Sequence, residues 1–208
     1  MGIRHARAAA ALFAYISFMP NPLILASTSR YRRELLERLG LPFSVESPHV
    51  DEIQLAGESP LANCTRLATE KAAAVGEKHP NAIVIGSDQV LDLNGEALSK
   101  PGDFANALAQ LKRCQGKTLQ CYTALCVASP GRAPLVDVVA TEIAYRNLPD
   151  DVLIAYLQRE KPYDAAGAVK VETSGIALLS AIRSDDPTAI IGLPLIRLTD
   201  FLRDLGAL

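Results

Sequence analysis

Two short polar segments each follow an apolar run in this 208-residue chain, and the first is suited to binding an anion. Ser27 to Ser29 follow the apolar run 23–26 and precede leucines at helical spacing, with Arg32 in the first turn. A buried strand that leads into a helix N-terminus presents free backbone N–H groups and the positive end of the helix dipole to an anion. Arg32 would add a bidentate contact to a phosphate. The alternative, an N-cap serine with solvated arginines, is favoured by spacing alone.

The second segment contains an acid, Asp88, in Ser87-Asp88-Gln89 after the apolar run 82–86. We expect this run to be a central strand with Asp88 at its carboxyl end, where open α/β sheets bind their ligands. A carboxylate there can hold a metal ion or act as a general base toward water. The alternative is an aspartate that caps a turn. It is the weaker alternative, because so apolar a strand rarely ends in a charge that has no partner.

Four further charged positions are candidates for phosphate or metal chemistry. Glu52 follows another acid, and in a strand only one of the two would face a cleft. Lys71 lies at the edge of the apolar face of a predicted helix, and Lys100 precedes a proline; either could reach phosphate as a point charge. Glu172 lies two residues after Lys170 in a stretch that reads as a strand, so both would share one face. Taken singly, each reads more simply as a solvated surface charge.

The elements that must position these residues follow from hydrophobic spacing and turn signals. Strands are expected at 23–26, 43–46, 82–86, 90–93, 96–98, 118–128 and 136–145, and helices at 32–39, from 59, 103–116, 149–160 and 195–205. Asn94-Gly95 predicts a hairpin turn. There is no repeat or long linker, so we expect one α/β domain: a mixed, elongated sheet flanked by helices, with two lobes around a cleft.

Composition excludes several other classes of protein. The net charge of −2 gives no global basic surface for a nucleic acid duplex. No apolar run reaches the roughly 20 residues that a membrane span needs. The cysteines form no CxxC pair and the histidines are scattered, so no zinc site is expected. Three of the four cysteines lie among apolar positions, which favours free thiols and a reducing, cytoplasmic compartment.

The first residues superficially resemble a signal peptide, with Arg4 and Arg7 before the apolar stretch 8–18. However, the first core strand follows without a convincing cleavage site, and Met19 offers an internal start. We therefore expect residues 1–18 to be a dispensable extension and residues 19–208 to be the domain.

Taken together, in their order along the chain, these motifs indicate more than each does singly. It runs Leu-Ala-Ser-Thr-Ser-x-x-Arg-Arg, Asp-Glu, Glu-Lys-Ala, Gly-Ser-Asp-Gln-Val, Lys-Pro, Ala-Gly-x-x-Lys-x-Glu and Ile-Gly-Leu-Pro. From about residue 23 to 205 this closely resembles the Maf-like nucleotide pyrophosphatases, and within them the 7-methyl-GTP pyrophosphatase branch. The branch markers are Tyr31, Gln89 and Glu172, where the dTTP/UTP branch typically has an arginine, a threonine and a glutamine.

The resemblance implies an enzyme that hydrolyses a nucleoside triphosphate between its α- and β-phosphates. It implies that Asp88 is the proton acceptor and that Mg²⁺ or Mn²⁺ is bound by Glu52 and Asp88. The implied specificity positions are Tyr31, Gln89 and Glu172, and the implied phosphate-binding positions are Ser27, Arg32, Lys71 and Lys100. One departure is the segment 167–173, which lacks the serine, the phenylalanine and the second glycine of the family motif Gly-Ser-Phe-Lys-x-Glu-Gly.

Two alternatives stay open beside this reading. One is a dTTP/UTP pyrophosphatase; the other is a nucleotide-binding regulator of cell division that does not turn its ligand over. The retained acids and lysines favour turnover. A homodimer is possible, and neither a nucleic acid nor a membrane is expected as a partner.

Overall fold

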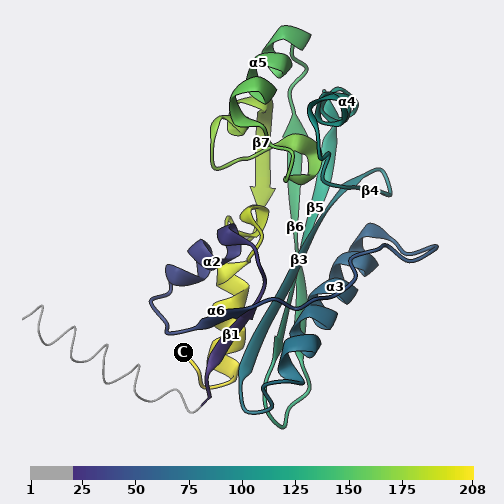
Figure 1. Cartoon of the computed structure of the whole chain (residues 1–208). Helices are drawn as coiled ribbons and strands as arrows, with labels where there is room; N and C mark the ends of the chain where they lie inside the picture. Colours follow the sequence, from purple (N-terminus) through teal and green to yellow (C-terminus); the bar gives the residue numbers. More distant parts are fainter. Residues whose placement is uncertain (1–20) are drawn as a thin grey trace, which may run out of the picture.

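Three long strands, β3 (Ile83–Leu93), β5 (Thr118–Ala128) and β6 (Leu135–Tyr145), run along most of the length of the molecule (Figure 1). The computed structural model describes residues 21–208, so the expectation that residues 1–18 are dispensable lies outside the described residues. The other strands are β1 (Leu23–Ala26), β2 (Ser44–Glu46), β4 (Glu96–Leu98) and β7 (Leu179–Ser184). The helices are α2 (Arg30–Glu37), α3 (Pro60–Gly76), α4 (Phe104–Cys114), α5 (Asp150–Glu160) and α6 (Leu195–Asp204), with short 3₁₀ turns η1 (Ala166–Ala168), η2 (Ser174–Leu178) and η3 (Ala189–Ile191).

The strands form one seven-stranded sheet in the order β2-β1-β3-β5-β6-β7, with β4 beside β3. β2, β1 and β3 pair in parallel, whereas all other pairs are antiparallel. The predicted mixed α/β sheet is therefore confirmed. No helix among residues 21–208 is long and apolar enough to cross a bilayer.

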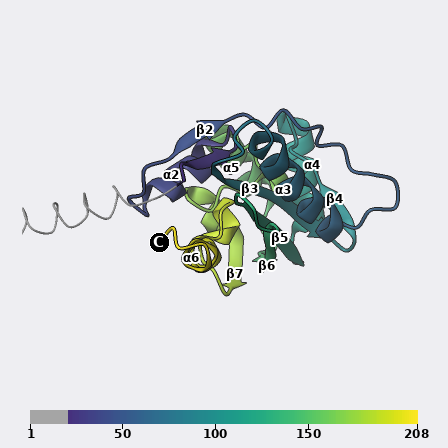
Figure 2. The same cartoon turned by 90° about the horizontal axis from the view of Figure 1, so that it is seen from below.

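In the lower half of Figure 1 the sheet is covered on both faces, as the view from below also shows (Figure 2). Alternate residues of β1 and β3 explain this arrangement, because successive side chains of a strand point to opposite faces. Ile24 and Val84 pack against α3, while Leu25 and Ile85 pack against α2 and α6. A strand buried on both faces has no polar alternation, which is why its sequence is an unbroken apolar run.

The upper half has a core of its own, where α4 and α5 cover the far ends of the long strands. Leu111, Leu153 and Leu157 from these helices are buried against Leu119 and Ile143 of the sheet. This core is separate from the two cores that lie on the two faces of the sheet in the lower half, and the long strands run through both halves. The two predicted lobes are these two packed halves.

Gly86 marks a close approach of β3 to α3. A Cβ atom there would lie 2.2 Å from the carbonyl oxygen of Ala68 and 2.7 Å from the backbone nitrogen of Ala72. Both atoms belong to the helix backbone, which cannot yield locally as a flexible side chain can. Any side chain at this position would push α3 away from the sheet.

Replacing Gly86 with alanine should therefore lower the free energy of unfolding by about 1–3 kcal/mol, as overpacking of a core does. Urea denaturation followed by circular dichroism would measure the change. Gly76→Ala is the matched control, because its Cβ would meet nothing closer than Val84 Cγ2 at 4.0 Å. Equal transition midpoints for the two variants would contradict this account of the packing.

Two predicted elements differ from the structure. The run 82–86 does not end before Asp88, because β3 continues to Leu93. The stretch that contains Lys170 and Glu172 is not a strand, since it consists of a turn between η1 and η2. Gly167 and the residue after it have φ angles of 70° and 54°, which an extended strand cannot contain.

Candidate functional site

An unpaired stretch of β3 forms the centre of the candidate site. β1 ends opposite Gly86, and β4 begins to pair only at Leu91. Residues 87–90 of β3 therefore have β5 on one side and, among residues 21–208, no strand on the other. Asp88 was expected at the end of its strand. Instead, β3 continues past Asp88, and it is the neighbouring strand β1 that ends beside this position. The result is still an open sheet edge with polar main-chain groups and Asp88 within it.

Asp88 is paired with a buried lysine. Lys71 Nζ lies 2.7 Å from Asp88 Oδ1 and 2.5 Å from Glu52 Oε1. The side chains of Lys71 and Asp88 are 5% and 8% exposed, whereas that of Glu52 is 56% exposed. The sequence suggested that Lys71 lies at the edge of the apolar face of a helix, but in the structure its side chain is buried. This burial is possible because two carboxylates replace the water that the ammonium loses.

Further positive charge surrounds Glu52. Burial raises the pKa of the Glu52 carboxyl, but the hydrogen bond and charge of Lys71, with smaller effects from Lys100 and Arg32, outweigh it and hold this pKa below its ordinary value. The three cations and two carboxylates therefore act on one another within one site. Glu52 is in a loop rather than a strand, and its neighbour Asp51 turns outward to accept the backbone N–H of Ile53.

Gln89 points to the opposite face of the sheet from Asp88, as adjacent strand residues do. Its side-chain nitrogen, Nε2, donates to the carbonyl oxygens of Ala189 and Ile190 at 2.9 and 3.0 Å and lies 3.1 Å from Thr123 Oγ1. Gln89 is therefore bonded to the η3 segment, far along the chain. Asp88 and Gln89 flank the open edge from its two faces.

The hydroxyl segment before α2 forms a turn that leads into the helix. Ser27 is buried, and its Oγ accepts the backbone N–H of Ser29. Ser29 is the N-cap residue, with its Oγ 3.4 Å from the backbone nitrogen of Arg32. The Arg32 side chain turns inward and donates from Nε to the carbonyl oxygen of Gly192 at 2.8 Å. Arg32 is thus fixed by the protein rather than free on the surface.

Tyr31 lies beside the loop of the upper lobe. Arg30 stacks over its ring at 4.7 Å and donates to its hydroxyl. Burial lowers the pKa of Lys170, but its contact with Asp164 and a smaller effect of Tyr31 outweigh it and raise this pKa. Tyr31 and Lys170 are therefore neighbours across the lobes, although Glu172 itself is exposed and has no hydrogen bond within residues 21–208.

Cys64 supports the main chain at the site rather than reacting there. Its Sγ lies 3.2 Å from the carbonyl oxygens of Asp88 and Tyr122. Burial, together with the charge of Asp88, raises the pKa of the Cys64 thiol to about 12. A thiol with so high a pKa is almost entirely protonated near neutral pH, so it is a structural donor and not a nucleophile.

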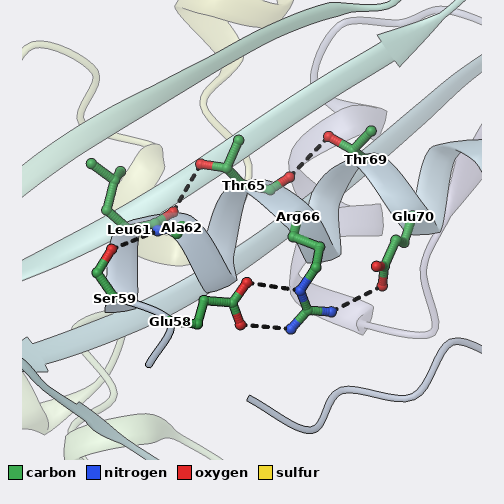
Figure 3. A pocket seen from close by; sticks show the side chains of 8 residues that line it. All are labelled: Glu58, Ser59, Leu61, Ala62, Thr65, Arg66, Thr69 and Glu70. Atoms are coloured by element: carbon green, nitrogen blue, oxygen red, sulfur yellow. Dashed lines mark hydrogen bonds and ion pairs between the residues drawn. The ribbon is translucent and has the colours of Figure 1, made fainter. Parts of the chain in front are cut away.

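A groove of about 630 Å³ lies on the outer face of α3 (Figure 3). Thr65 and Thr69 there donate back to carbonyls of their own helix, and Arg66 bridges Glu58 and Glu70. None of the predicted site residues lines this groove. The groove is therefore not part of the candidate site.

The structure thus brings Glu52, Lys71 and Asp88 into direct contact, with Arg32 and Lys100 near enough to act on Glu52. Ser27 is bonded only to its own turn, and Glu172 contacts none of the other predicted residues by a hydrogen bond or ion pair within the described range. Sequence reasoning missed the carbonyl groups of the segment 189–192, because backbone acceptors carry no residue-type signal.

Comparison with known proteins finds a family, curated relatives and solved structures to which this chain is similar. The family described as Maf-like protein matches residues 22–205. The chain is 53% identical over 187 residues to the 7-methyl-GTP pyrophosphatase of Bordetella avium, which covers 89% of this chain and 94% of that protein. It is 52% identical over 186 residues to the enzyme of that name from Cupriavidus pinatubonensis, covering 88% and 93%. The solved Ham1 protein of Staphylococcus aureus aligns with a TM-score of 0.45 at 18% identity, covering 61% of this chain and 73% of that one.

Proposed function

This chain belongs to the Maf-like protein family, and from that premise we propose that it hydrolyses a nucleoside triphosphate to a nucleoside monophosphate and pyrophosphate. The observation that carries the proposal is the contact of Asp88 and Glu52 with Lys71 at an open edge of the sheet. A triphosphate is a polyanion, and Arg32 and Lys100 bring further positive charge to the same place. The substrate we propose is 7-methyl-GTP, the nucleotide in the names of both relatives.

The chemistry assigned to this site is attack of water on the α-phosphorus. One oxygen of Asp88, Oδ1, is bonded to Lys71, which leaves Oδ2 to accept a proton from the attacking water. As the new P–O bond forms, the bond from the α-phosphorus to the α–β bridging oxygen breaks, and that oxygen leaves with pyrophosphate. Arg32 and Lys100 would stabilise the negative charge of the leaving group, since positioning and electrostatics supply most of the catalysis in such reactions.

The carboxylates suit a divalent ion only in part. Glu52 Oε2 is not bonded to Lys71 and could bind the ion, whereas Asp88 Oδ2, which the proposed reaction uses to accept a proton, would bind it through its second lone pair. Carboxylate oxygens are ligands that Mg²⁺ and Mn²⁺ prefer. No group of three or more His, Cys, Asp or Glu side chains that could hold a metal occurs among the described residues. Two carboxylates completed by substrate phosphates and water are a common Mg²⁺ arrangement. A bound ion would supply charge neutralisation at the phosphates.

Activity should accordingly depend on Mg²⁺ or Mn²⁺, and binding of the ion should depend on nucleotide. We expect EDTA to lower pyrophosphate release by roughly tenfold or more and either ion to restore it, because the ion neutralises phosphate charge. A zinc-selective chelator should have no effect. Electron paramagnetic resonance of Mn²⁺ should show tighter binding when a non-hydrolysable triphosphate is present. Full activity after exhaustive EDTA treatment would remove the metal from the proposal.

For recognition of the base we propose Tyr31, Gln89 and Glu172. The face of the Tyr31 ring already accepts a cation, the guanidinium of Arg30 at 4.7 Å. A base made cationic by methylation would gain about 0.5–2 kcal/mol from the same attraction. The exposed carboxylate of Glu172 can accept hydrogen bonds from the N1–H and the N2 amine of guanine.

A comparison of 7-methyl-GTP, GTP, UTP and dTTP tests the substrate. Glu172→Ala should lower kcat/KM for 7-methyl-GTP by about fivefold to a hundredfold, the effect of leaving polar groups of the base unpaired, and should change UTP hydrolysis little. Tyr31→Ala should reduce the preference for 7-methyl-GTP over GTP. If the wild-type protein prefers UTP or dTTP, the proposed branch is wrong. The segment 168–173, which differs from the family motif, would then be the first region to examine for the cause. Binding of nucleotide without pyrophosphate release would favour the regulator instead.

We also propose that the protein works in the reducing cytoplasm on free nucleotide, without a nucleic acid or membrane partner. The four cysteines are buried free thiols, and the net charge of −2 gives no broad basic surface. Assembly as a homodimer stays a prediction. Sedimentation equilibrium of the purified chain would test it.

A further inference from the structure

The segment between β7 and α6 binds Gln89 through its backbone. The carbonyl oxygen of Ala189 accepts from Gln89 Nε2 at 2.9 Å and from Thr123 Oγ1 at 2.8 Å. The carbonyl oxygen of Ile190 accepts from Gln89 Nε2 at 3.0 Å. Thr123 is fully buried on β5, directly opposite Gln89 in the sheet register. Both N–H bonds of the Gln89 amide are therefore used within the protein.

The same segment binds Arg32 at its other end. The carbonyl oxygen of Gly192 accepts from Arg32 Nε at 2.8 Å and from Ser87 Oγ at 2.9 Å. Ser87 is fully buried on β3, and its hydroxyl also lies 2.8 Å from the carbonyl oxygen of Ala124. With Nε bonded in this way, the two terminal NH₂ groups of Arg32 are the ones left for a ligand.

A buried carboxylate holds the segment in shape. Asp186 is 2% exposed, and its Oδ1 accepts the backbone N–H of Thr188 at 3.0 Å and lies 2.7 Å from the Thr188 hydroxyl. Its Oδ2 accepts the N–H groups of Ile196 and Arg197 at the start of α6, at 2.7 and 3.4 Å. Four donors on one buried carboxylate fix a short segment firmly, since each lost bond would leave a buried acceptor unsatisfied.

We propose that residues 186–192 form one rigid positioning element that orients Arg32 and Gln89 together, with Ser87 and Thr123 as positioning residues. The inference rests on the proposed function for the roles of Arg32 toward phosphate and Gln89 toward the base. It adds that these two roles are coupled, because a shift of the segment at one end moves the carbonyl acceptor at the other.

The element also fixes which hydrogen bond Gln89 can make. A flipped amide would place Oε1 against two carbonyl oxygens, so repulsion keeps Nε2 toward Ala189 and Ile190. Only Oε1 remains for a ligand, and it can only accept. Gln89 therefore selects a ligand N–H or O–H over a carbonyl oxygen, in agreement with the donor edge of a guanine.

Thr123→Val tests the coupling, because valine keeps the shape of threonine and removes the hydroxyl. We expect the KM of the best nucleotide and the inhibition constant of inorganic pyrophosphate to rise together by about threefold to tenfold, the effect of one neutral hydrogen bond, with kcat nearly unchanged. Thr123→Ser, which keeps the hydroxyl, should restore both constants. Thr65→Val is the control, since among residues 21–208 its hydroxyl bonds only to the carbonyl oxygen of Leu61 within α3. A rise in KM with an unchanged constant for pyrophosphate would overturn the proposal.

A second measurement needs no substrate. In the free protein, Ser87→Ala removes a bond at the Gly192 end, and hydrogen exchange of the Gln89 side-chain amide, followed by NMR, reports on the other end. Faster exchange supports one rigid element, whereas an unchanged rate shows two independent contacts and overturns it. If no nucleotide is hydrolysed, the proposed function fails, and the exchange rates still decide this inference.

Discussion

Replacing Asp88 with asparagine lowers the turnover number for nucleotide hydrolysis by about 10²- to 10⁴-fold, the usual effect of losing a general base. Asparagine has the shape of aspartate, and its carbonyl oxygen can still accept from Lys71, so the site should keep its geometry. What it lacks is the oxygen that takes a proton from water. Release of pyrophosphate under saturating nucleotide measures the effect.

Asp92→Asn is the matched control for this substitution. Asp92 lies on the same strand and accepts the backbone N–H of Gly95 in the hairpin turn, away from Lys71. We expect its turnover to stay near that of the wild type. Near-normal turnover by a folded Asp88→Asn protein would rule out Asp88 as the proton acceptor.

Among the substitutions considered, removing the buried ammonium of Lys71 should lower the free energy of unfolding most. Lys71→Met keeps an apolar stem of similar length but leaves Asp88, whose side chain is 8% exposed, without its cation. Breaking a buried ion pair from one side typically costs about 3–5 kcal/mol, because the remaining charge is buried and uncompensated. Denaturant unfolding of the purified variant measures this loss.

Two comparisons test whether the loss of stability in Lys71→Met comes from the unpaired charge of Asp88. Adding Asp88→Asn to Lys71→Met should recover part of the lost stability, since it removes the unpaired charge. Lys112→Met breaks an ion pair with Asp150 whose partners are 45% and 59% exposed, and such exposed pairs contribute only about 0–1 kcal/mol. If Lys71→Met and Lys112→Met prove equally stable, the ammonium of Lys71 does not compensate Asp88 as the structure implies.

Much of the fold follows from local patterns. The turn Asn94-Gly95 joins β3 to β4 as predicted, and the helices predicted from 59 and 103 are α3 and α4, with Ser59 and Asp103 as their N-cap residues. These signals act over a few residues and need no knowledge of the rest of the chain. The unbroken apolar runs likewise identified strands with both faces covered.

The end of β3 could not be found in this way. Residues 87–89 are polar, and polarity after an apolar run usually means that a strand has stopped. Here β5 pairs with β3 through this region, and the side chains of Ser87, Asp88 and Gln89 find partners on α3, β5 and the segment before α6. Tertiary contacts satisfied the polar groups, so the strand continued.

The sequence by itself determined the family, the mixed α/β sheet and which acids and cations are candidates, because these depend on residue types in order. Only the tertiary structure decided how they meet. From the sequence Lys71 looks like a surface charge, but in the structure it is paired with Asp88 and Glu52. Nothing in the sequence shows that the carbonyl oxygens of Ala189 and Ile190 in η3 accept from the Gln89 amide. The physical reason is that burial and backbone acceptors set the energies of such groups, and both come from residues far apart in the chain.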